Sequence, residues 1–133
     1  MISNNQPKKL VLPATTNLPF VDFDSQTGVF IIKGRSFSEN ALPFYEQINA
    51  WVEAYLSTKP TSTYLTIAFQ YLNTSSGVQI YSFLKTLHQS KVEGNSLTVI
   101  WGYEDDDDDL QQVGADFSSA LGLPFEFKVV EFE

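Results

Sequence analysis

The chain lacks cysteine altogether and has a single histidine, His88, among its 133 residues. Without cysteine it forms no disulfide, no cysteine-ligated zinc site and no iron–sulfur cluster, and it has no thiol nucleophile. A single imidazole argues against a zinc site and leaves His88 as the only base for a serine triad. We expect no metal and no cofactor, and we expect His88 to be an ordinary residue near a helix end.

Positive charge is also scarce, since 8 Lys and Arg stand against 16 Asp and Glu, a net charge of −8. A polyphosphate backbone would be repelled, so nucleic-acid binding is disfavoured. No run approaches the roughly 18 apolar residues of a membrane-spanning helix, and residues 1–9 lack the apolar centre of a signal peptide. We therefore expect a cytoplasmic protein that does not insert into membranes.

Common enzyme signatures are missing as well: there is no phosphate loop, no dinucleotide-binding glycine motif and no nucleophile elbow. The absence of these motifs argues against the enzyme classes that use them. What is present is a globular composition, 43% hydrophobic and 14% aromatic, on a length that fits one domain. We expect residues 1–9 to form a frayed polar tail and residues 10–133 to form a single domain.

Strand and helix patterns alternate along the chain and predict an α/β fold. Residues 10–12 form an edge strand, and residues 20–24 and 29–32 form an N-terminal β-hairpin that Gly34 terminates. Later strand-like runs cover residues 64–72, 97–101 and 125–130. The order hairpin, helix, strand, helix, strand, helix, strand implies a mixed β-sheet with crossover helices packed on it.

The first helix is expected to start near Asn40, because Pro43 is tolerated only in a first turn. Ser36, Ser38 and Asn40 are candidate N-caps, and Ser36 with Glu39 has capping-box spacing. Its apolar stripe at helical period consists of Tyr45, Ile48, Val52 and Tyr55.

A second helix follows the turn 73–77, carries a stripe at Ile80, Leu84 and Leu87, and ends at Gly94-Asn95. A third helix covers residues 110–121, where Gly114 weakens it.

Six consecutive acidic residues precede the third helix: Glu104, Asp105, Asp106, Asp107, Asp108 and Asp109. The last of them favour the start of a helix through its dipole, and the others can simply form a solvated loop. The run could also be a weak divalent-cation site or a docking patch for a basic partner. Because the EF-hand pattern is absent, docking is the better functional interpretation.

The most informative segment is residues 72–77, Leu-Asn-Thr-Ser-Ser-Gly, which joins a buried-type strand to a helix. Free backbone N–H groups at a helix start favour an anion. The hydroxyls can serve as helix caps, but three in a row exceed what capping needs. A phosphate here would add about −1.5 to −2 charges to an exposed turn. On the residues alone, a cap and a phosphorylation site both remain open.

Two stretches of the chain resemble the SiaC family of bacterial regulatory phosphoproteins, and together they cover roughly residues 10–128. The first consists of Phe23-Asp24, Thr27-Gly28, Gly34-Arg35-Ser36, Glu39-Asn40, Trp51 and Tyr55-Leu56. The second consists of Tyr71-Leu72-Asn73-Thr74-Ser75-Ser76, Trp101-Gly102-Tyr103, the acidic run and Leu123-Pro124-Phe125. The order and spacing of these pieces make the match specific.

This resemblance implies a fold similar to STAS domains, the class that includes anti-sigma-factor antagonists, and a non-enzymatic partner-switching protein in signal transduction. In the family, a threonine of the Asn-Thr-Ser-Ser turn is phosphorylated by a protein kinase and dephosphorylated by a PP2C-like phosphatase. The unmodified form binds and activates a diguanylate cyclase, which raises cyclic di-GMP. The corresponding acceptor here is Thr74. Asn73, Ser75 and Ser76 would orient the loop and contact the partner.

Ser75 is the alternative acceptor, because STAS antagonists carry Asp-Ser-Ser-Gly at this turn and use the first serine. Other functions also remain open. One is a STAS-like module that binds a small ligand or anion in an apolar pocket beside Thr74. Others are an antagonist-type switch acting on a different effector, and an enzyme that uses Ser75 and the acidic run. A last one is an interaction protein with Phe37, Phe44 and Tyr45 as its contact surface, although most such aromatic residues fill cores.

Overall fold

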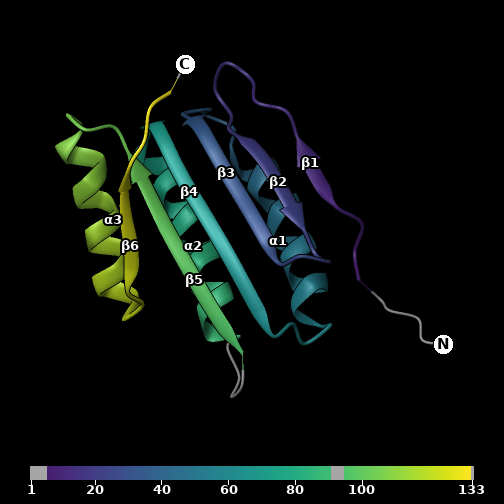
Figure 1. The fold of residues 1–133 in the computed structure, drawn as a ribbon. Helices are drawn as coiled ribbons and strands as arrows, with labels where there is room; N and C mark the ends of the chain where they lie inside the picture. The colour runs from purple at the N-terminus through teal and green to yellow at the C-terminus, as the bar shows by residue number, and fades with distance from the viewer. Residues whose placement is uncertain (1–5, 91–94, 133) are drawn as a thin grey trace.

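The structure, a computed structural model, describes residues 6–90 and 95–132. Its elements in chain order are β1 (Leu10–Leu12), β2 (Phe20–Asp24), β3 (Val29–Ser36), α1 (Leu42–Leu56), β4 (Ser62–Leu72), α2 (Thr74–Gln89), β5 (Ser96–Tyr103), α3 (Asp108–Leu121) and β6 (Phe125–Val129). The strands form one sheet in the order β1-β2-β3-β4-β5-β6 (Figure 1). The first three strands pair antiparallel and the last four pair parallel. The predicted mixed sheet with an N-terminal hairpin is confirmed.

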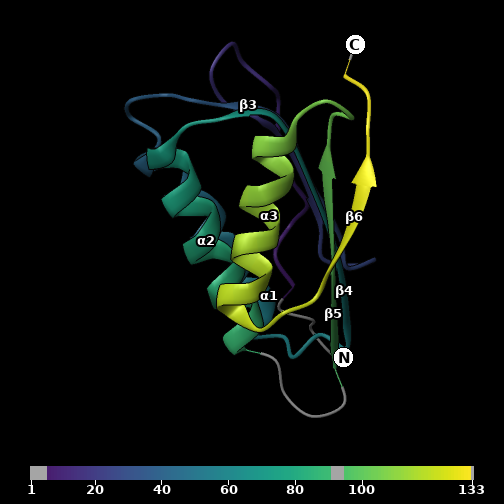
Figure 2. The ribbon, with the colours of Figure 1, turned by 90° about the vertical axis from the view of Figure 1, so that its left-hand side faces the viewer.

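Within the residues that the structure describes, the helices α1, α2 and α3 cover one face of the sheet, and no helix covers the other face (Figures 1 and 2). Each helix connects a parallel strand to its next neighbour in the same direction across the sheet. Crossovers of one hand that advance in one direction must lie on one face. The N-termini of α2 and α3 therefore lie at the same end of the sheet, the end at which β4 and β5 finish. Within the described ranges, no helix is long and apolar enough to cross a membrane.

The core lies between the helices and the sheet, and it contains the stripes that the sequence predicts. Tyr45, Ile48, Val52 and Tyr55 of α1 are buried, as are Ile80, Leu84 and Leu87 of α2. Aromatic rings fill much of the remaining volume. The rings of Phe23 and Phe30 stack with centroids 4.6 Å apart, and the buried Trp101 donates its indole N–H to the carbonyl of Leu110 at 2.9 Å. This polar contact satisfies the indole where it has no water.

Strand β3 does not end at Gly34, so this prediction is wrong. Gly34 has φ +127°, which glycine adopts without a Cβ penalty, and the strand continues to Ser36. The β4 partners change from Phe69 opposite Gly34 to Tyr71 opposite Arg35, which leaves Gln70 as an extra residue. Gly34 therefore marks a β-bulge rather than a strand end. The bulge places Ser36 opposite Leu72, at the exit of β4.

The predicted N-cap of the first helix is also wrong. Helix α1 begins at Leu42, and its N-cap residue Ala41 makes no side-chain capping bond. Ser36, a candidate for both the cap and the capping box, is a strand residue of β3. Ser38 Oγ accepts a hydrogen bond from the N–H of Asn40 at 3.2 Å, before the helix begins. Local side-chain bonds in the loop thus compete with capping.

Helix α2 ends at Gln89, with Ser90 as its C-cap, before the predicted end. Gly94, which belongs to that predicted end, lies outside the described residues.

The polar N-terminal segment is described from residue 6 onward. The carbonyl of Pro7 accepts a hydrogen bond from Ser25 Oγ at 2.8 Å, and the carbonyl of Lys8 accepts one from the indole of Trp51 at 2.6 Å. Residues 1–5 of the predicted tail lie outside the described ranges. The described part is thus held against the sheet and α1.

Gly114 is required where α3 crosses Trp101. A Cβ added to Gly114 would lie 2.5 Å from Cδ1 of Trp101 and 2.6 Å from its Nε1. Both are closer than atoms can approach without displacement. The glycine that lowers the helix propensity of α3 is thus what lets the helix lie on the indole.

We expect Gly114→Ala to destabilise the protein by about 1–3 kcal/mol through overpacking. Helix propensity alone predicts the opposite, a gain of about 1 kcal/mol. Urea unfolding measures the difference, with exposed Gln111→Ala on the same helix as the control, for which the change should stay within about 0.5 kcal/mol. A stabilised Gly114→Ala protein would contradict the packing explanation.

Candidate functional site

The turn of residues 73–77, called here the α2 turn, begins α2 directly after β4. Asn73 is the N-cap residue, and its Oδ1 accepts a hydrogen bond from the N–H of Ser76 at 2.8 Å. The carbonyl of Asn73 accepts the N–H of Gly77 at 2.9 Å. Asn73 therefore does the capping that the sequence left open to the hydroxyls, as its residue type favours. The hydroxyls of Thr74, Ser75 and Ser76 are not needed for it.

The three hydroxyl residues of the α2 turn have different environments. Thr74 and Ser75 are exposed, whereas Ser76 is 0% exposed. Ser36 Oγ donates a hydrogen bond to Ser76 Oγ at 2.8 Å, and Tyr45 OH lies 2.6 Å from Ser36 Oγ. Ser76 is thus engaged inside the protein. Thr74 and Ser75 are the hydroxyls of this turn that another protein can reach.

The two buried tyrosines of α1 keep their protons. Burial raises the pKa of Tyr45 from 10.0 to about 12, and its hydrogen bond with Ser36 acts in the opposite direction. Burial likewise raises the pKa of Tyr55, whose hydroxyl lies 2.7 Å from Thr63 Oγ1 at the other end of the helix.

An open groove of about 550 Å³ runs between α2 and α3 beside the α2 turn. Its walls are mainly apolar, and Thr74 lines it whereas Ser75 does not. Val78 on its α2 side is 60% exposed, and Tyr81 meets Phe117 of α3 with ring centroids 5.5 Å apart. The apolar pocket that would favour a small-ligand module is therefore present next to Thr74.

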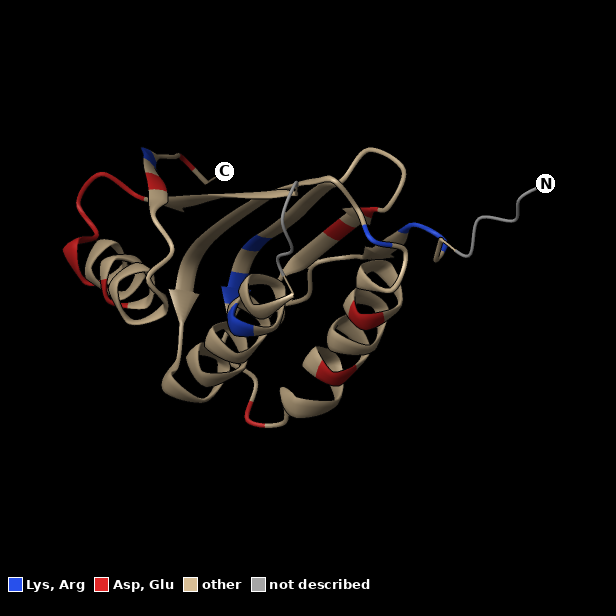
Figure 3. Cartoon of the chain, turned by 90° about the horizontal axis from the view of Figure 1, so that it is seen from below, with Lys and Arg blue, Asp and Glu red and all other residues tan. Residues whose placement is uncertain are grey.

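The acidic run lies at the start of α3 and in the loop before it. Asp107 is the N-cap residue, with its Oδ1 accepting the N–H of Leu110 at 3.0 Å, and Asp108 and Asp109 lie in the first turn. This confirms that the last acids favour the helix start. Figure 3 shows the red loop at the outer side of α3. Across residues 6–90 and 95–132, no group of three or more His, Asp or Glu could hold a metal ion.

None of the six residues of the acidic run lines the groove beside Thr74. The carboxylate that does is Asp116, which accepts a hydrogen bond from Gln112 Nε2 at 2.8 Å. Sequence reasoning missed Asp116 because a lone acid in a helix has no local signal. Its place depends on how α3 is turned toward α2.

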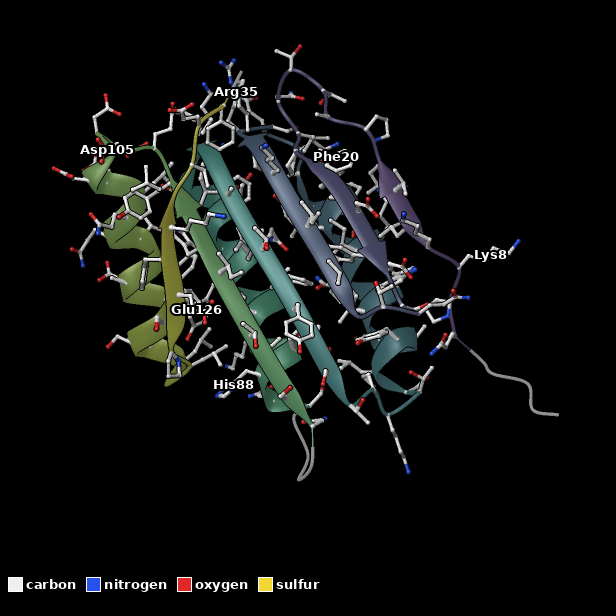
Figure 4. All side chains as sticks on the ribbon, viewed as in Figure 1. Lys8, Phe20, Arg35, His88, Asp105 and Glu126 are labelled. Carbon is white, nitrogen blue, oxygen red and sulfur yellow. The ribbon has the colours of Figure 1, made fainter. Side chains whose placement is uncertain are left out.

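Other singled-out residues lie apart from the α2 turn or inside the protein. His88 is half-buried in the last turn of α2, at the opposite end of the molecule from Arg35 (Figure 4). Tyr45 is buried, and Phe44 packs on it with ring centroids 5.1 Å apart. Phe37 packs on Tyr71 instead, at 5.3 Å. These aromatic residues do not form one exposed contact surface.

The raised pKa of Tyr45 predicts a loss of stability in alkali. The unfolded chain releases this proton near pH 10, whereas the folded protein holds it until about pH 12. The stabilising contribution is therefore complete below pH 10 and disappears by about pH 12, a loss of roughly 2–3 kcal/mol. Urea unfolding at pH 8 to 12 measures it. Tyr45→Phe should show a shallower decline, and an equal slope would contradict the assignment.

The SiaC family regulatory phosphoprotein model matches residues 12–130. An uncharacterised protein of Pseudomonas aeruginosa (strain UCBPP-PA14) is 27% identical over 116 residues, which span 87% of this chain and 92% of that protein. The structure of SiaC of Pseudomonas aeruginosa has a TM-score of 0.82 and 25% identity, covering 92% of this chain and 98% of that one. A chain in the crystal structure of diguanylate cyclase SiaD in complex with its activator SiaC, from the same organism, has a TM-score of 0.83 and 26% identity, with 91% and 99% covered. This chain belongs to the SiaC family of regulatory phosphoproteins.

Proposed function

We propose that this chain is a non-enzymatic regulator that binds and activates a diguanylate cyclase while Thr74 is unphosphorylated. The effector class is supported by the similar structure in which SiaC is the activator of the diguanylate cyclase SiaD. Control by phosphate is supported by the family's description as regulatory phosphoproteins. The observation that carries the proposal is the position of Thr74, exposed at the first residue of α2 and lining the apolar groove.

A phosphate on Thr74 would act through charge. It would bring about −1.5 to −2 charges to the rim of an apolar groove that also carries Asp116. A partner covering this rim would bury the dianion without a cation, which costs several kcal/mol. Each 1.4 kcal/mol changes affinity tenfold, so the modification can end binding. The fold itself tolerates the phosphate, because the N-terminus of α2 favours an anion.

Thr74 is favoured over Ser75 as the acceptor because Thr74 lines the groove. Ser75 is also exposed and remains the alternative. The proposal requires a protein kinase that uses cytoplasmic ATP and a PP2C-like phosphatase. The acidic run, on the outer side of α3, would serve as a docking patch for a basic segment of one of these partners. Residues 10–133 would act as one domain.

Phosphosite mapping by mass spectrometry on the protein from its own cells tests the proposal first. We expect a phosphate on Thr74. In binding and cyclic di-GMP synthesis assays with the cognate cyclase, Thr74→Ala should match the unphosphorylated wild type, and Thr74→Asp should bind at least tenfold more weakly. Ser75→Ala is the comparison at the alternative acceptor, and its binding should still weaken on phosphorylation as that of the wild type does. Equal affinity of Thr74→Ala and Thr74→Asp would contradict the mechanism.

The groove favours a second candidate function, a STAS-like module that binds a small apolar ligand. Its volume of about 550 Å³ falls within the range of ligand pockets, and its apolar walls carry few polar groups, among them Thr74 and Asp116.

Val78→Glu places a charge in the groove at a position that is 60% exposed, so the fold should be retained. If the groove holds a ligand, native mass spectrometry of the protein from its own cells should show an added mass that this variant loses. If the groove serves the cyclase, the wild type should show no added mass, and the variant should bind the cyclase at least tenfold more weakly. Normal cyclase binding by Val78→Glu would contradict the role of the groove in the first proposal.

A further inference from the structure

A closed ring of hydrogen bonds lies beneath the α2 turn. The N–H of Asn73 donates to the carbonyl of Ser36 at 3.0 Å, and the N–H of Ser76 donates to Oδ1 of Asn73 at 2.8 Å. Ser36 Oγ closes the ring by donating to Ser76 Oγ at 2.8 Å. Thr74 and Ser75 are the residues between Asn73 and Ser76, so the ring holds both ends of this pair and leaves their side chains outside.

Tyr45 anchors the ring to α1. Its hydroxyl lies 2.6 Å from Ser36 Oγ, and the three side chains of Tyr45, Ser36 and Ser76 are all buried. The hydroxyls of Tyr45, Ser36 and Ser76 thus form one buried chain of hydrogen bonds. Removing any member leaves a buried polar atom without its partner, which is costly in a low-dielectric interior. The ring therefore has one favoured arrangement.

We propose that Ser36 and Tyr45 are positioning residues for Thr74. They hold the first turn of α2 so that Thr74 is exposed to a kinase and Ser76 stays buried. Neither residue reaches the groove surface, so both act through Ser76 and Asn73. The inference rests on the proposed function for the role of Thr74. The ring itself is independent of that role.

The chain offers a matched control for a purely structural effect. Tyr55 lies on the same helix, is as buried as Tyr45, and places its hydroxyl 2.7 Å from Thr63 Oγ1. It sits at the end of α1 away from the α2 turn. Tyr45→Phe and Tyr55→Phe thus remove the same atom from the same helix, and each takes one hydrogen-bond partner from a buried hydroxyl, that of Ser36 or of Thr63. A general loss of stability should be similar in the two variants.

The test measures amide hydrogen exchange by NMR at Ser76 and Gly77. Each exchange rate is divided by the rate at Ile67, in the buried centre of β4, to give an exchange ratio. We expect Tyr45→Phe and Ser36→Ala to raise this exchange ratio at least tenfold, because the turn loses a buried hydrogen bond while the sheet stays folded. Tyr55→Phe should leave the ratio within twofold of the wild type. An unchanged ratio in Tyr45→Phe, or an equal increase in Tyr55→Phe, would overturn the proposal. If Tyr45→Phe does not fold, Ser36→Ala decides by the same criteria.

A second arm measures where phosphate is found in protein expressed in its own cells. We expect Ser36→Ala to lower the ratio of phosphate on Thr74 to phosphate on Ser75 and Ser76 at least fivefold, with Tyr55→Phe unchanged. An unaltered ratio in Ser36→Ala would overturn the positioning role. If the wild type carries no phosphate at all, the proposed function fails, and the exchange ratios alone decide whether Ser36 and Tyr45 position the turn.

Discussion

The pairing of β3 with β4 at their last residues determines the geometry of the end of the molecule that carries the α2 turn. Because the register shifts at Gly34, Ser36 comes to lie opposite Leu72, one residue before the cap of α2. From there its carbonyl receives the N–H of Asn73 and its hydroxyl meets Ser76. One strand residue thus contacts both the N-cap and the first turn of a helix that begins about forty residues later. The cap, the exposed Thr74 and the mouth of the groove all follow from that pairing.

The rest of the fold brings an apolar groove to this turn, and none of the acidic run lines that groove. Helix α3 lies on Trp101 at Gly114, which sets how closely it approaches the sheet and therefore the width of the groove beside α2. The acidic run is placed at the outer side of α3 (Figure 3). Near Thr74 the groove keeps a single carboxylate, Asp116. The proposed phosphate on Thr74 would add about −1.5 to −2 charges to an apolar groove that otherwise carries one carboxylate.

Local patterns predicted the elements well and their ends poorly. The stripes of α1 and α2 and the central strand β4 are determined by periodicity within a few residues, and the structure has them where expected. Helix α3 instead begins at Asp108, inside the acidic run and before the predicted start at Leu110, because Asp107 caps it. The other errors occur where distant contacts decide. Gly34 has the local signature of a strand end but permits a bulge, and Ser36 resembles a cap but is held by Tyr45 and Ser76. Gly114 lowers the helix propensity of α3, but it is the residue that leaves room for the indole of Trp101.

The sequence by itself determined the mixed α/β order, the exclusion of thiol and cysteine–metal chemistry, the unusual run of hydroxyls after β4 and, by resemblance, the family. These depend on composition and on neighbours along the chain. Only the tertiary structure separated the three hydroxyls into a buried Ser76 and the exposed Thr74 and Ser75, and only it placed Thr74 on the groove. Burial and groove walls are made by residues from α1, β3 and α3, and their distances from this turn depend on how the helices pack, which no local pattern encodes.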